Sequence, residues 1–422
     1  MVPIIVGAVV LILVIVIGSS LYSRFAKKNA PVTLTYWGLW EPMSVMQPVI
    51  SDYEASHPNV KITYSMQSPK NYRTRLQSAI SGGTGPDIAR IHNTWLPMLQ
   101  KSLAPAPDSI VPLSLISSYY PVVQKNAVVG GKVYALPLEI DGLALFYNED
   151  MLKEVGTSPP SDWNTLRKLA FDLTKTNLET KIIERAGAAI GTTNNVEHWP
   201  DILGLLILQN SGDPSKPTST AVQDALTFFT IFSGQDKSWD ASQPNSVYAF
   251  ATGTVAMILA PSWQVAEIKA INPNLKFGVA PAPTLPSTNV AWASYWMEAV
   301  PVSSKNQSAA WEFIKYLSSE EALQKMYAGA SQIHTIGEPY PLMSMKNLVS
   351  SDPLAGAFVN QGNAYTSWPL VDRTYDEGVN DEFIKYYEDA VNAIGSGSTV
   401  GSVIKTLDEG VQQVVAKYPP TQ

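Results

Sequence analysis

The sequence of 422 residues contains no cysteine. This absence excludes disulfide bonds, thiolate metal ligands, thiol nucleophiles and membrane attachment through a lipid-modified cysteine. Positive charge is also scarce, because 29 basic residues stand against 36 acidic ones, and the net charge of −7 argues against a nucleic-acid partner. A hydrophobic content of 45% excludes a disordered chain. The length instead predicts a globular protein of two or three domains.

Motifs that carry cofactor or catalytic chemistry are absent as well. The sequence has no GxxxxGK phosphate loop, no GxGxxG turn that opens a helix, no HExxH and no GxSxG. Its four histidines, His57, His92, His198 and His334, are scattered singly along the chain. We therefore expect no metal and no cofactor, and an enzyme built on this chain would have to work with carboxylates.

The N-terminal segment lacks charge. Every residue from 2 to 17 is apolar, glycine or proline, and Arg24, Lys27 and Lys28 close the segment. This length predicts a transmembrane anchor within residues 1–30. A cleaved signal peptide is the alternative, although such peptides usually carry basic residues before the apolar stretch. Residues 31–422 then form a body with 26 basic and 36 acidic residues, a net charge of −10.

Strands and helices alternate along this body. Apolar and polar residues alternate over 32–36 and 60–64, which predicts strands, and apolar residues recur at helical spacing between them. With a second helix over 72–80 and a strand over 88–91, the pattern is typical of a parallel sheet covered by helices. The fold class is α/β. Further helices are predicted over 166–173, 202–208, 221–232, 309–317, 320–327 and 383–394, and further strands over 133–137, 143–147, 255–259, 277–279 and 299–302.

Tryptophans follow several of the predicted strands. The sequence has eleven of them, and Trp40, Trp95 and Trp263 each stand where a strand gives way to a loop. The carboxyl ends of parallel strands face the ligand crevice in such folds. A flat aromatic ring covers the apolar face of a pyranose, so this set favours a mono- or oligosaccharide ligand. By contrast, Trp163 and Trp311 are predicted to pack inside the protein.

Polar residues accompany these tryptophans. Glu41 adjoins Trp40, and Asn93 precedes Trp95 by two residues. Glu139 and Asp141 stand two apart on what is predicted to be extended chain, so they should point the same way. Carboxylates and amides bind the hydroxyl groups of sugars, so these residues are candidates for ligand binding. The alternative is that Glu139 and Asp141 are simply two acidic residues exposed to solvent.

Short motifs stand in a recognisable order over about 390 residues. They include 34–37 (LTYW), 85–88 (GPDI), 131–137 (GKVYALP), 145–148 (LFYN), 160–163 (PSDW), 250–257 (FATGTVAM), 262–263 (SW), 299–301 (AVP) and 311–317 (WEFIKYL). In this order the body resembles the family 1 extracellular solute-binding proteins of ABC importers, the group that includes maltose-binding protein.

The resemblance implies a two-lobed fold with a hinged cleft. It places 31–141 with 296–346 in the first lobe and 142–295 with 347–422 in the second, with hinge crossings near Asp141, Trp296 and Lys346. A monomeric, non-enzymatic binding protein would deliver its ligand to a membrane permease. Carried over by position, the candidate ligand-binding residues are Trp40, Glu41, Asn93, Trp95, Glu139, Asp141, Trp199, Trp263, Trp296 and Trp368.

The sequence departs from the family at its tether. The lipid-bearing cysteine common among relatives of monoderm bacteria is missing, and the apolar segment would replace it as an anchor. That substitution favours an extracellular or periplasmic body. The basic flank of Arg24, Lys27 and Lys28 argues for the opposite orientation, because positive residues tend to stay in the cytoplasm.

Two other functions are compatible with these residues. A carbohydrate-active hydrolase could use Glu41, Glu139 or Asp141 as acid and base. An anchored adhesin would have a rigid surface and no cleft.

Overall fold

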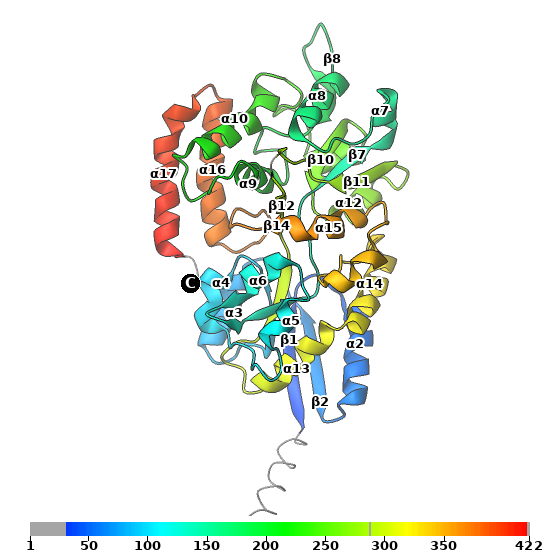
Figure 1. Cartoon of the computed structure of the whole chain (residues 1–422), viewed down its shortest axis with the longest axis vertical. Helices are drawn as coiled ribbons and strands as arrows, with labels where there is room; N and C mark the ends of the chain where they lie inside the picture. The colour runs from blue at the N-terminus through cyan, green and yellow to red at the C-terminus, as the bar shows by residue number, and fades with distance from the viewer. Residues whose placement is uncertain (1–30, 287, 420–422) are drawn as a thin grey trace, which may run out of the picture.

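The computed structural model describes residues 31–286 and 288–419, and its strands form two five-stranded sheets. Each sheet is the centre of one lobe, the first at the bottom and the second at the top of Figure 1. The predicted anchor, residues 1–30, lies outside the described residues. No helix in the described part of the chain is long and apolar enough to cross a membrane.

The first lobe is built on a sheet into which a strand from much later in the chain is inserted. Its order is β2 (Val60–Met66), β1 (Val32–Gly38), β3 (Ile88–His92), β13 (Trp296–Ala299) and β6 (Ala135–Pro137). As predicted, β1 runs parallel to both β2 and β3. However, β13 runs antiparallel to β3 and to β6, so the sheet is mixed.

The helices of the first lobe cover this sheet through apolar faces. In α2 (Met43–Ser56) the buried residues recur at helical spacing, and they are Val45, Met46, Val49, Ile50 and Tyr53. The helix α14 (Glu320–His334) packs beside α2, and α13 (Gln307–Leu317) packs against β1. On the other side of the molecule α3 (Tyr72–Ser81) buries Tyr72, Leu76 and Ile80.

The second lobe has a mixed sheet of the order β11 (Phe277–Pro281), β7 (Ala144–Asn148), β10 (Val255–Ala260), β9 (Ile183–Ala188) and β8 (Lys175–Thr176). All six residues of β10 are buried, which explains why this strand is continuously apolar in sequence. The strand runs parallel to β9 and antiparallel to β7.

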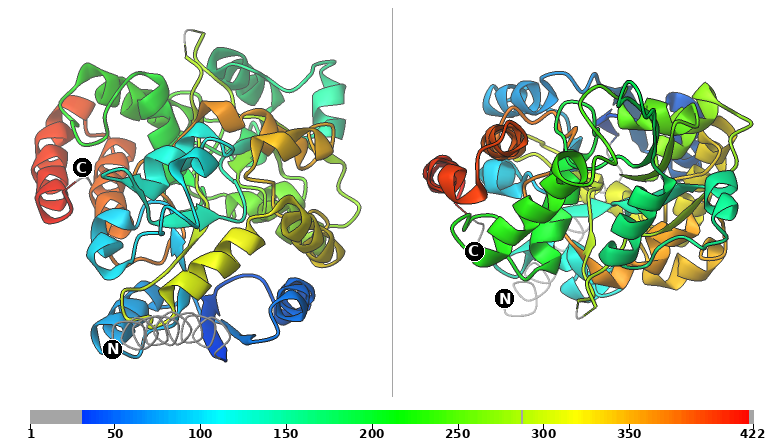
Figure 2. Two further views of the ribbon diagram at one scale, coloured as in Figure 1. Left: turned by 60° about the horizontal axis from the view of Figure 1, so that its bottom comes forward. Right: turned by 90° about the horizontal axis from the view of Figure 1, so that it is seen from above.

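Helices surround the second sheet. They include α8 (Trp163–Leu173), α9 (Trp199–Gln209), α10 (Thr220–Gly234), α16 (Val379–Gly395) and α17 (Val400–Lys417). The last two form a hairpin on one flank, drawn in orange and red in Figures 1 and 2. Trp163 and Trp311 are fully buried, as predicted for packing residues.

One predicted strand is displaced. The apolar run 299–302 predicted a strand there, but β13 covers Trp296–Ala299. The reason is Glu298, which is fully buried within the strand and pairs with Arg90 of β3 at 2.7 Å. A charged residue in the middle of a buried strand breaks the apolar pattern on which sequence reading depends.

The chain passes between the two sheets three times. The first crossing joins β6 to β7, the second joins β12 (Ala291–Trp292) to β13, and the third lies between α14 and α15 (Gly356–Asn360). Backbone hydrogen bonds hold these segments side by side: Ser294 donates to the carbonyl of Asp141 at 2.9 Å, and Ile140 donates to that of Pro339 at 2.8 Å. The lobe boundaries at 141/142, 295/296 and 346/347 stay predictions.

Candidate functional site

A cavity of about 390 Å³ lies beside these crossing segments, between the two lobes. Its wall takes Trp40, His92 and Trp296 from the first lobe and His198 and Trp263 from the second. This volume is within the range of small-molecule sites in proteins. Among the described residues, no group of three or more histidines and carboxylates is arranged to hold a metal ion.

Aromatic rings form the wall of the cavity on the first lobe. Trp40 follows β1 and keeps 38% of its surface exposed. Its ring lies edge-to-face with Trp296 at 5.6 Å and 6.3 Å from the ring of Tyr375. Behind them, the buried Trp95 contacts Trp296 edge-on at 5.3 Å. The buried Trp95 therefore supports the partly buried ring of Trp296, which in turn contacts Trp40.

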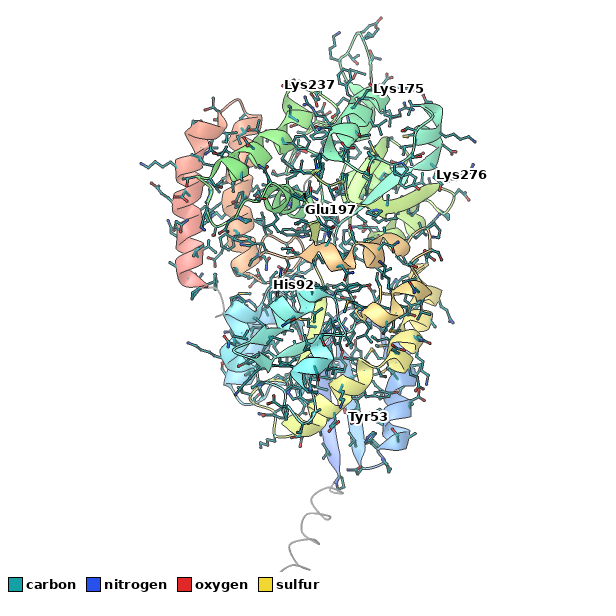
Figure 3. All side chains as sticks on the ribbon, viewed as in Figure 1. Tyr53, His92, Lys175, Glu197, Lys237 and Lys276 are labelled. Atoms are coloured by element: carbon teal, nitrogen blue, oxygen red, sulfur yellow. The ribbon has the colours of Figure 1, made fainter. Side chains whose placement is uncertain are left out.

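A second exposed tryptophan faces the cavity from the second lobe. Trp263 follows β10, at the start of α12 (Gln264–Ile271), and is 39% exposed. The guanidinium carbon of Arg373 lies 5.3 Å from the ring centre, and the ring of His198 lies edge-on at 5.4 Å. Arg373 also forms an ion pair with Glu197. In Figure 3, Glu197 lies on the second-lobe side of the boundary and His92 lies near it on the first-lobe side.

Two carboxyl groups meet on the wall of the cavity. Glu139, which follows β6, and Glu338, which follows α14, hydrogen-bond to each other. Burial raises the pKa of Glu139 well above its usual value and that of Glu338 to about 7. The backbone N–H of Trp296 donates to Oε1 of Glu139 at 3.2 Å. The two groups therefore share a proton near neutral pH, since two adjacent carboxylates repel each other.

Asp141 connects the first crossing segment to the second lobe. Its carboxylate accepts hydrogen bonds from Gly142 N–H at 2.7 Å, from Ser262 N–H at 3.1 Å and from Ser262 Oγ–H at 2.8 Å. Burial nevertheless raises its pKa to about 8. Asp141 thus links the first crossing segment to Ser262 of the second lobe in addition to its place in the cavity wall.

A second acidic pair lies deeper in the second lobe. Asp201 accepts hydrogen bonds from Trp292 Nε1–H at 2.8 Å and from the backbone N–H of Asp372 at 2.9 Å. Burial raises the pKa of Asp201 well above its usual value and that of Asp372 to about 7. Burial also lowers the pKa of the neighbouring His198 to about 3, with a smaller contribution from Arg373.

These pKa shifts predict that the protein loses stability as pH rises above 6.5. Asp141, Glu338 and Asp372 bind protons in the folded state at pH values where the unfolded chain has released them, so unfolding releases protons. We expect the free energy of unfolding to fall by about 1.4 kcal/mol per pH unit and proton between pH 6.5 and 8. Below this window His92 and His198, whose pKa values are lowered to about 3, act in the opposite direction.

Urea unfolding of the ligand-free protein at pH 6.5 and 8 measures this loss. Asp141→Asn should reduce the pH dependence, because the amide does not titrate. A free energy of unfolding that is constant or rises over the same window would contradict the pKa assignments.

Five of the ten sequence-predicted site residues line the cavity: Trp40, Glu139, Asp141, Trp263 and Trp296. The other five lie elsewhere. Glu41 pairs with Arg90, Asn93 donates to Asn126 Oδ1 at 3.1 Å, Trp95 is fully buried, Trp199 is buried in α9, and Trp368 packs on Phe383 at 4.4 Å. Trp40 lines the cavity, but the chain bends at this residue, and the ion pair with Arg90 directs Glu41 elsewhere.

Sequence reading missed the part of the wall that comes from irregular chain. Asp372, Arg373 and Tyr375 belong to the strap, residues 372–378, which has neither helical nor strand spacing. Arg373, Tyr375 and Glu377 have positive φ angles of 55°, 51° and 44°, a conformation that non-glycine residues rarely adopt.

Contacts with the first lobe hold the strap in this conformation. Arg73 of α3 donates from Nη2 to the carbonyl of Glu377 at 3.3 Å and from Nε to that of Asp376. Asn380, at the start of α16, donates to Thr94 Oγ1 at 2.8 Å. The strap therefore connects the two lobes at the edge of the cavity.

Comparison with known proteins identifies the same fold. Residues 37–324 match the sequence model of the family described as bacterial extracellular solute-binding protein. The multiple sugar-binding protein of Streptococcus mutans is 25% identical, over 71% of this chain and 74% of its own length. The diacetylchitobiose binding protein DasA of Streptomyces coelicolor is 24% identical, over 68% of this chain and 70% of its own.

Solved structures are similar over nearly the whole body. The sugar-binding protein MalE of Xanthomonas citri superimposes with a TM-score of 0.74 at 22% identity, covering 91% of this chain and 98% of that protein. The cyclic alpha-maltosyl-1,6-maltose binding protein of Arthrobacter globiformis gives 0.73 at 19% identity, covering 92% and 100%. The predicted two-lobed α/β fold is confirmed by this likeness.

Proposed function

The chain belongs to the bacterial extracellular solute-binding protein family, and we propose that it captures a carbohydrate for an ABC importer. Members of this family bind solutes rather than transform them, so the protein is not an enzyme. The observation that carries the carbohydrate assignment is the cavity wall, where exposed tryptophans from both lobes stand beside buried carboxyl groups.

The wall matches the surface of a sugar. A pyranose has apolar C–H faces and a rim of hydroxyl groups. Aromatic rings bind the C–H faces, and hydrogen-bonding side chains bind the hydroxyl groups. Trp40, Trp263 and Trp296 supply the rings, while Glu139 and Asp141 lie at the wall as polar partners. Several relatives carry sugar-binding names, which supports the same assignment.

Ligand would close the two lobes over the cavity. Both lobes contribute to the wall, so a bound sugar contacts the whole wall only when the two lobes are close together. Binding therefore favours the closed state. The crossing segments are the hinge in this mechanism. Micromolar binding requires about 8 kcal/mol, which a few stacked rings and hydrogen bonds can supply.

Delivery to a membrane completes the proposal. Residues 1–30 would anchor the body on the outer side of the cell membrane, close to a permease that takes the sugar from the closed complex. The conflict with the basic flank of the anchor is resolved if the large body is exported irrespective of these charges.

The alternatives receive less support. An adhesin needs no cavity of this kind between its lobes. A hydrolase would need a free catalytic carboxylate, whereas Asp141 accepts hydrogen bonds from Gly142 and Ser262.

A thermal-shift screen of residues 31–422 tests the proposal. A carbohydrate that binds the folded state should raise the melting temperature progressively with its concentration, by the equivalent of about 2.7 kcal/mol at one hundred times the dissociation constant. Isothermal titration of the hits then measures the affinity. If no member of a broad panel of mono- and oligosaccharides binds, the carbohydrate assignment is overturned.

A further inference from the structure

The charges on the cavity wall are unbalanced. Among the described residues, one guanidinium lines it, that of Arg373. Arg373 is already paired, with Glu197 and with Asp372, whose carboxylate lies 3.9 Å from Nε. The carboxyl groups that line the same wall are those of Glu139, Asp141, Asp201, Glu267, Glu338 and Asp372.

Within the described chain, three histidines line this wall against six carboxyl groups, and one of them, His334 at the end of α14, is only partly buried. His92 and His198 are buried, and burial lowers the pKa of each to about 3, so both rings are neutral in the physiological range. A ligand in this cavity therefore meets an excess of acidic groups.

Among these acidic groups, the Glu139–Glu338 pair has no basic side chain of the described residues paired with it. The charged groups around the pair are Glu41, Asp141 and Arg90. Arg90 lies nearby, but its charge is already matched, because its Nε contacts Glu298 at 2.7 Å and its Nη1 contacts Glu41. The pair instead holds a shared proton, which is the arrangement expected where a cation is missing.

The aromatic wall adjoins this pair. The backbone N–H of Trp296 donates to Glu139, and the ring of Trp296 lies edge-to-face with that of Trp40. Tryptophan faces attract cations as well as the C–H faces of sugars. The same few residues thus provide a sugar-binding surface and a site of negative charge.

We infer that the ligand is an amino sugar, whose protonated amine lies between Glu139 and Glu338. This inference rests on the proposed function and specifies its substrate class. The ammonium group replaces the protons of the pair as the countercharge: a ligand R–NH₃⁺ enters, both carboxyl groups become ionised, and the protons that they held leave to solvent. A neutral sugar has only hydroxyl groups to offer and leaves the pair in its proton-sharing state.

Matched ligands test the inference. The probes are glucosamine, galactosamine, mannosamine and the β-1,4-linked glucosamine disaccharide, each compared with its hydroxyl and N-acetyl counterparts by isothermal titration at pH 6. We expect at least one amine to bind about tenfold or more tighter than both of its counterparts. Titration in buffers of different ionisation enthalpy should show between about one and two protons released per bound amine and none per bound hydroxyl form, because both carboxyl groups of the pair hold protons below pH 7.

A substitution of Glu338 tests whether the Glu139–Glu338 pair causes the preference for the amine. Glu338→Gln should weaken binding of the amine by about tenfold or more and abolish its proton release, while the hydroxyl form changes less than about threefold. Glu409→Gln, a change on the exposed face of α17, is the matched control and should behave as the native protein. Melting curves show whether both variants are folded. If Glu338→Gln does not fold, the number of protons that the native protein releases on binding an amine still tests the inference.

The outcomes separate the two proposals. Binding of neutral or N-acetylated sugars as tight as binding of the amines overturns the amino-sugar inference and leaves the carbohydrate function standing. Tight amine binding that Glu338→Gln does not weaken, or that releases no proton, also overturns the inference. Absence of binding by every sugar overturns the carbohydrate function and the inference with it.

Discussion

Replacing Trp263 by alanine should weaken carbohydrate binding by about 30-fold or more, equivalent to ~2 kcal/mol. The ring is 39% exposed at the wall of the cavity, and Arg373 and His198 hold it there from two sides. Alanine removes the stacking surface that the second lobe offers to a sugar, and it removes part of the contact that draws the lobes together. Isothermal titration with the sugar found in the screen measures the loss.

Two variants make this result interpretable. Trp263→Phe keeps a smaller aromatic face and should lose less affinity than Trp263→Ala. Phe171→Ala is the matched control, because Phe171 is 62% exposed on α8 and does not line the cavity. Equal affinities of Trp263→Ala and the native protein would show that the sugar does not stack on this ring.

Replacing Glu298 by alanine should lower the free energy of unfolding by about 3–5 kcal/mol. Arg90 and Glu298 are both almost fully buried in the first sheet, at neighbouring positions of β3 and β13. Without Glu298, the guanidinium of Arg90 keeps only Glu41 as its charged partner and faces a void in place of a carboxylate. Urea unfolding at 25 °C measures the change.

The control for this prediction is an exposed ion pair. Glu321→Ala breaks the contact of Glu321 with Lys325 at 2.9 Å on the surface of α14, and it should cost less than about 1 kcal/mol. A cost for Glu298→Ala as small as that of Glu321→Ala would mean that the buried charges contribute little to holding β3 and β13 together.

The regular part of the fold could be predicted from the sequence, because its apolar residues follow simple periods. The buried stripe of α2 and the alternation along β1 place both elements correctly. Strand β13 could not be placed in the same way, since its register depends on the partnership of Glu298 with Arg90, some two hundred residues earlier in the chain. Such a pairing leaves no local pattern.

The ends of strands made part of the candidate site predictable. Trp40 and Trp263 follow strands, and the rule about strand ends found both. The same rule failed for Trp95, which also follows a strand but turns inward, because the rule does not specify the direction of a side chain. Glu338 and Arg373 come from loops whose course is set by contacts with distant residues, so the sequence alone gives no signal for them.

The place of β13 also has a consequence for the order of folding. This strand lies between β3 and β6, yet the whole of the second sheet separates it from them in the chain. The first sheet therefore cannot be completed until synthesis has passed Ala299, however early its other four strands emerge from the ribosome. Contacts between segments so far apart in sequence form slowly. The first lobe therefore completes its fold only after the second sheet has been synthesised.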